Sequence, residues 1–267
     1  MNALLYVLLA CPQVPISLTR EPVQTQITVW IDDLASDSIR WNATEAVSEL
    51  RENFSEAEPS LYLALWSSDR QQRQLAAFIL MTQGERLGHP DILIATAVEA
   101  LSDDELPGFG VQNGTMPHVT NLKAAVRFLR DPVRGQLAAP ELRRVLEDHS
   151  DWQARLFAAD ILARSGDRTS RKRVVNTLLG HLQDNHQRGD AAVALKALHA
   201  MGPTILPQIE SWQPPDEQAA AGRDLLIRHL SGNPPSPQML ETMPYRVITN
   251  CVRDPIAEDW LGPLLIF

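Results

Sequence analysis

A pattern of one arginine, two small residues and one aliphatic residue recurs along the chain and constrains its fold more than any other feature. In segment 151–166, DWQARLFAADILARSG, Arg155 is followed by the small pair at 158–159 and then by Leu162. The arginines that match Arg155 are Arg40, Arg73 and Arg188. Arg40 and Arg73 lie 33 residues apart, as do Arg155 and Arg188. Self-similarity at a fixed period of this length is typical of repeat proteins.

One further unit fits the pattern with Leu122 in the arginine position, followed by Ala125, Val126 and Leu129. Leu122 precedes Arg155 by 33 residues but follows Arg73 by 49, so this unit holds about 16 additional residues. The sequence therefore predicts an insertion at residues 102–119, SDDELPGFGVQNGTMPHV, within the third unit.

An acidic or hydroxyl residue stands four positions before each arginine; it is Ser36 in the first unit and aspartate in the other three. Its side-chain oxygen can accept a hydrogen bond from a free amide at a helix start, which is worth roughly 1 kcal/mol. The arginine one turn later can pair with that carboxylate. We therefore expect a structural ladder made of Asp69, Arg73, Asp151, Arg155, Asp184 and Arg188.

The small residues that follow each arginine allow a neighbouring helix to approach closely, and the aliphatic residue seven positions on falls on the same helical face. The pattern predicts that the alanine pairs are buried against the next helix: Ala76, Ala77, Ala158, Ala159, Ala191 and Ala192.

An apolar segment precedes each of these helices and is itself predicted to be a helix. The predicted ends of the preceding helices are Leu34, Leu65, Leu101, Leu146, Leu182 and Ile209. Each unit is thus predicted to be a helix that ends in leucine, a short turn with aspartate, and a helix with arginine and small residues. This pattern resembles the HEAT and HEAT-like (PBS lyase-type) repeat family over about residues 25–230. The resemblance implies an all-α fold, an armadillo-like α-solenoid of about six helix pairs with a helical C-terminal cap.

The predicted organisation has three parts: an N-terminal leader or tether at 1–24, the repeat array at 25–231 and the C-terminal cap at 232–267. Within the leader, the residues Leu8-Leu9-Ala10-Cys11 resemble a bacterial lipobox, which would make Cys11 a lipidation site. The leading residues carry no lysine or arginine, and a frayed terminus is the alternative. The expected location is therefore the cytoplasm, or the cell envelope if the lipobox is real.

Charge is distributed unevenly along the chain. Residues 1–119 contain 6 Lys/Arg and 16 Asp/Glu, whereas residues 120–267 contain 18 Lys/Arg and 17 Asp/Glu. This distribution argues against a nucleic-acid partner, which requires a continuous basic track. It permits a basic protein partner at the first half, or it is simply a solvated acidic face. Segment 164–173, RSGDRTSRKR, is the strongest basic cluster, and it is either a patch for an anionic ligand or partner, or a solvated turn.

The insertion is the predicted contact surface, because insertions in repeat arrays fall in loops on one face, often the binding face. Its glycines let the backbone turn freely, and its apolar residues could anchor a partner. The candidate partner-binding residues are Asp103, Asp104, Glu105, Phe109, Gly110 and Met116. A tolerated surface insertion is the alternative.

Motifs for nucleophilic catalysis, phosphate-binding loops and zinc sites are absent from the sequence. The sequence therefore favours a non-enzymatic protein–protein interaction scaffold with no cofactor and no metal, and it leaves the oligomeric state open. The family resemblance implies two alternatives. The first is a lyase-type subunit that attaches chromophores, and the second is a HEAT-like DNA glycosylase, which the charge distribution disfavours. The tryptophans near helix ends are expected to seal contacts between units.

Overall fold

The computed structural model describes residues 20–35, 40–83, 90–102, 121–182 and 190–233. Within these ranges the chain is all-helical, with twelve α-helices, two short 3-10 turns and no strand, which confirms the predicted all-α class. The candidate residues of the insertion, Cys11 and the C-terminal cap beyond residue 233 lie outside the described ranges.

The helices alternate between two sets that correspond to the two halves of each predicted unit. The first helices are α1 (Arg20–Asp32), α3 (Phe54–Ala64), α5 (Pro90–Glu99), α7 (Pro132–Asp148), α9 (Arg171–Gly180) and α11 (Leu206–Ser211). The second helices are α2 (Arg40–Glu52), α4 (Arg70–Gln83), α6 (Asn121–Leu129), α8 (Trp152–Ser165), α10 (Asp190–Ala200) and α12 (Glu217–Leu230). The 3-10 turn η1 (Ala100–Ser102) follows α5, and η2 (Pro203–Ile205) precedes α11.

The predicted ends of the first helices agree with the structure to within a few residues. For example, α3 ends at Ala64, beside the predicted Leu65, and α9 ends two residues before Leu182. Helix α7 continues two residues past Leu146. The apolar segments that precede the repeated arginine pattern thus locate the first helices.

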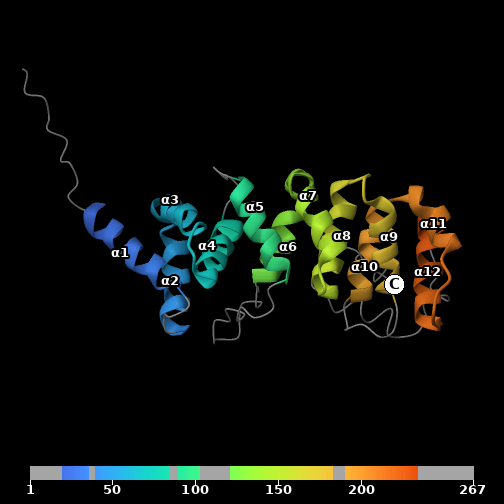
Figure 1. Ribbon diagram of the computed structural model, residues 1–267, viewed down its shortest axis with the longest axis horizontal. Helices are drawn as coiled ribbons and strands as arrows, with labels where there is room; N and C mark the ends of the chain where they lie inside the picture. The colour runs from blue at the N-terminus through green and yellow to red at the C-terminus, as the bar shows by residue number, and fades with distance from the viewer. Residues whose placement is uncertain (1–19, 36–39, 84–89, 103–120, 183–189, 234–267) are drawn as a thin grey trace, which may run out of the picture.

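Helices follow one another in chain order along the long axis of the molecule (Figure 1). Each second helix packs against the next one, so that α2, α4, α6, α8, α10 and α12 form one continuous layer. Among the first helices, α1 packs against α3 and α5 packs against α7. In Figure 1, α3, α5 and α7 lie toward the upper edge and α2, α6 and α10 toward the lower edge.

The alanine pairs of α4 and α8 lie in the core. Both alanines at 76–77 in α4 and both at 158–159 in α8 are completely buried, as predicted. The leucines seven residues after the two arginines, Leu80 and Leu162, are also completely buried. Ala191 is partly buried against the core, and the side chain of Ala192 lies outside the described ones.

Helices α7 and α8 approach each other closely at Gly135. A Cβ atom at this position would lie 2.9 Å from the carbonyl oxygen of Leu129 and 2.9 Å from the Cβ of Ser165. Real Cβ atoms do not sit this close to backbone and side-chain atoms, so glycine is required for α7 to pack at this distance. This contact fixes α7 on α8 and so positions one wall of the site described below.

A buried aspartate links the end of α6 to α8. The carboxylate of Asp160 is completely buried and accepts hydrogen bonds from Nε of Arg130 and from Nε of Arg164, each at 2.7 Å. Removing one member of a buried charged group leaves the others without compensation, which is strongly destabilising.

Replacing Asp160 with asparagine should therefore lower the free energy of unfolding by about 3 kcal/mol, because Arg130 and Arg164 lose their shared anion. Urea denaturation followed by circular dichroism measures this change. The matched control is Glu141→Gln, which removes the exposed partner of Arg144 and should cost at most about 1 kcal/mol. Equal losses in the two variants would contradict the structural role of Asp160.

Candidate functional site

The loop between α8 and α9 begins at Gly166, which adopts a left-handed conformation with φ 74° and ψ 24°. The amides of Gly166 and Asp167 both donate to the carbonyl oxygen of Leu162, which ends α8. Glycine takes up this conformation without steric cost, and so it is common at the end of a helix. The chain is then directed through residues 167–170 toward the start of α9.

Asp167 holds this loop together. Its carboxylate accepts hydrogen bonds from the backbone amide of Ser170 at 3.0 Å and from the Ser170 hydroxyl. It also accepts one from Nη2 of Arg143 on α7 at 3.0 Å. Burial alone would raise the pKa of Asp167, but the hydrogen bonds from Ser170 and the charge of Arg143 outweigh it and lower the pKa. The loop is thereby tied to α7 by a carboxylate that stays ionised.

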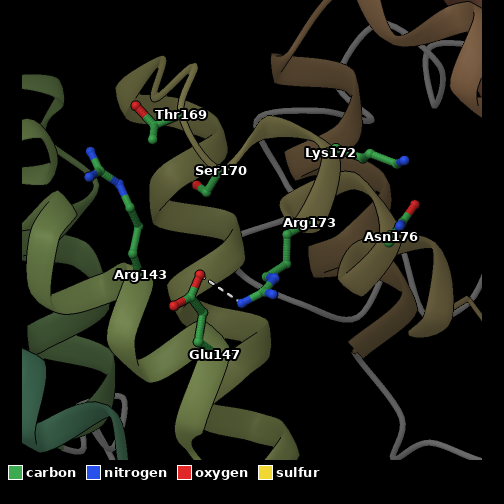
Figure 2. A pocket seen from close by; sticks show the side chains of 7 residues that line it. All are labelled: Arg143, Glu147, Thr169, Ser170, Lys172, Arg173 and Asn176. Atoms are coloured by element: carbon green, nitrogen blue, oxygen red, sulfur yellow. Dashed lines mark ion pairs between the residues drawn. The ribbon is translucent and has the colours of Figure 1, made fainter.

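A hollow of about 430 Å³ lies between α7, this loop and α9 (Figure 2). Every side chain that lines it is polar or charged. The lining residues are Arg143, Glu147, Thr169, Ser170, Lys172, Arg173 and Asn176. Six of the seven come from two helices, α7 and α9, or from the residue that directly precedes α9.

An ion pair crosses the hollow. Nη1 of Arg173 on α9 lies 2.7 Å from Oε1 of Glu147 on α7, and Figure 2 shows the two side chains facing each other. On the far side of α9, Gln208 of α11 donates to Oδ1 of Asn176 at 2.9 Å and to the carbonyl oxygen of Lys172 at 3.0 Å. Helix α9 therefore has polar contacts with both α7 and α11.

The structure describes two of the three predicted ladder arginines, Arg73 and Arg155, and both contact carbonyl oxygens that follow the preceding helix. Asp69 and Asp151 accept hydrogen bonds from first-turn amides, as expected for helix starts. Arg73 donates to the carbonyl oxygens of residues 67 and 68 and pairs with Glu99, and Arg155 donates to the carbonyl oxygen of residue 149. The aspartates are already engaged by amides, whereas carbonyls at the end of the preceding helix lack partners. Both arginines thus join a second helix to the end of the helix before it, and Arg73 also reaches α5.

Parts of the predicted site cannot be placed. The insertion residues Asp103, Asp104, Glu105, Phe109, Gly110 and Met116 lie outside the described ranges, as do Cys11, Asp184 and Arg188. The prediction that the insertion contacts a partner therefore stays a prediction.

Sequence reasoning missed a set of exposed apolar side chains on the first helices. Leu63 in α3 and Trp66 just after it are 74% and 76% exposed. Val133 and Leu137, one turn apart at the start of α7, are also exposed. Tryptophans were expected to seal contacts between units; Trp66 does not. A signal was present in segment 60–66, SLYLALW, which carries more leucines than one helical face can bury.

Two histidines meet where α10 packs against α12. The rings of His199 and His229 are arranged edge to face, with their centroids 4.5 Å apart. Burial and the charge of His229 lower the pKa of His199. Two imidazolium ions at this distance would repel each other, so this interface favours the neutral form of His199.

The pair makes stability depend on pH. Folding lowers the pKa of His199. The contribution of this side chain to the free energy of unfolding is therefore fully present above its unfolded pKa of 6.5 and is lost as the pH falls below that value. The urea midpoint should therefore fall between about pH 7.5 and about pH 5.5, and His199→Gln should reduce that fall. An unchanged pH dependence in His199→Gln would contradict this assignment.

Among the described residues, none of the helices combines the length and apolar character needed to cross a membrane, and no cluster of three or more His, Cys, Asp or Glu side chains could hold a metal ion. A scan against models of protein families finds no match, and neither does a search of curated proteins.

Proposed function

We propose that this chain is a non-enzymatic protein-interaction scaffold, built from HEAT-like helix pairs that stack as an α-solenoid. Support for the stacking comes from the continuous layer of second helices, which keeps chain order from α2 to α12. In repeat proteins each unit packs against its neighbours, and the resulting elongated surfaces bind partners.

The observation that carries the proposal is the placement of the exposed apolar side chains. In the described part of the chain, every exposed large apolar residue belongs to a first helix or to the turn directly after one. These residues are Val23, Val29, Leu63, Trp66, Val133 and Leu137. Among the side chains that the structure describes, those of the second helices that are large and apolar are covered.

Leu63 and Trp66 form the most exposed part of this set. The amide of Trp66 donates to the carbonyl oxygen of Leu63 at 3.0 Å, so the two residues are one turn apart. Tryptophan is enriched among the residues that dominate binding energy at protein interfaces, and its truncation there often costs more than about 2 kcal/mol. We assign these two residues as a contact point for a protein partner. The insertion remains a second predicted contact surface.

Substituting both Leu63 and Trp66 with serine should weaken partner binding by about 30-fold or more, because the apolar contact area is removed. The partner is first captured with the wild-type chain and purified, and its affinity is then measured by calorimetry. The melting temperature should change little, since both side chains are exposed in the free protein.

The matched control is a double serine substitution at Thr82 and Gln83, which are exposed at the end of the second helix α4. This variant should bind as the wild type does. If the Leu63/Trp66 variant kept full affinity, or if the control lost as much, the first helices would not be the binding face.

A further inference from the structure

We propose that the hollow between α7 and α9 binds a phosphate group, presented either as inorganic phosphate or as a phosphate monoester. The proposal rests on the side chains of the hollow and is independent of the protein-scaffold proposal.

Local charge favours an anion here. Residues 132–182 contain nine Lys/Arg and six Asp/Glu, whereas the whole chain contains 24 Lys/Arg and 33 Asp/Glu. The charged side chains that line the hollow are three cations, Arg143, Lys172 and Arg173, and one anion, Glu147, in a protein whose net charge is −9. A concave region with an excess of one sign of charge raises the local concentration of the opposite ion.

One buried hydrogen-bond donor of the hollow lacks an acceptor. Nε of Arg143 is buried and has no hydrogen-bond partner, although Nη2 of the same side chain pairs with Asp167. Lys172 contributes a third cationic side chain, in addition to Arg143 and Arg173. Buried donors are nearly always paired in folded proteins, and phosphate oxygens are acceptors of the required kind.

The start of α9 carries more cations than the carboxylate beside it, Asp167, offsets. Its first turn begins with three cations, Arg171, Lys172 and Arg173, and contains no acidic residue. Ser170 stands at the N-cap position, but its hydroxyl donates to Asp167 and does not cap the helix. Cations at a helix N-terminus oppose the helix dipole, and a phosphate bound among them would offset that cost.

The acid that now occupies the hollow can be displaced. The side chains of Arg173 and Glu147 are 53% and 48% exposed, and exposed ion pairs contribute little to stability. A phosphate dianion can therefore take the place of Glu147 beside Arg173 at small cost. The volume of about 430 Å³ falls within the range of small-ligand pockets, and the polar lining disfavours an apolar ligand.

The test measures binding of inorganic phosphate and of O-phosphoserine to the full chain by calorimetry, with ionic strength held constant by sodium chloride. Saturable binding to the wild type is expected, and Lys172→Gln and Arg173→Gln should each weaken it by about tenfold. The control is Arg144→Gln. Arg144 lies on α7 beside Arg143, but it is 73% exposed and pairs with Glu141 outside the hollow.

A second pair of variants tests the opposite direction. Glu147→Gln removes the competing carboxylate and should tighten binding several-fold, whereas Glu141→Gln should leave it unchanged. Tighter binding of O-phosphoserine would identify a monoester as the ligand, and tighter binding of inorganic phosphate would identify the free ion. The absence of saturable binding of both probes would overturn the proposal. A loss of phosphate affinity in Arg144→Gln as large as in Lys172→Gln would also overturn it, because the loss would then follow from the change in net charge and not from the side chains of the hollow.

Discussion

Close packing of the second helices on one another and on the first helices is the constraint on which the rest of the structure depends. Helix α8 contacts α6, α7, α9 and α10, and the alanines at its centre are completely buried. Larger side chains there would force the helices apart, at a cost of about 1–3 kcal/mol. On this layer, the absence of a side chain at Gly135 lets α7 approach α8 closely, which positions the α7 wall of the hollow between α7 and α9.

Sequence periodicity was sufficient to predict the helices because each repeated position has a simple local reason. Aspartate at a helix start accepts first-turn amides, as Asp151 does, and small residues at fixed spacing mark a buried face. The role of the arginines was harder to predict. Arg155 reaches back across the turn to the carbonyl oxygen of His149, and this contact depends on the angle between two helices, which local spacing does not define.

The candidate site could be predicted only in part. Segment 164–173 stands out as basic, and one interpretation of it was a patch for an anion. Its acidic and basic partners on α7, Glu147 and Arg143, are more than twenty residues away in sequence, and only packing brings them to α9. Likewise, the exposure of Trp66 depends on which neighbours cover the end of α3, and composition carries no information about that.

Native-state hydrogen exchange tests the stacked-repeat arrangement most directly. In such an array each unit is stabilised by its neighbours, so a defect at one end should remain local. Leu226→Ala in α12 removes a buried side chain and should cost about 2–5 kcal/mol. The account predicts faster amide exchange in α10–α12 and unchanged exchange in α1–α4. A uniform increase across all helices would instead show that the chain unfolds as one cooperative bundle and would contradict it.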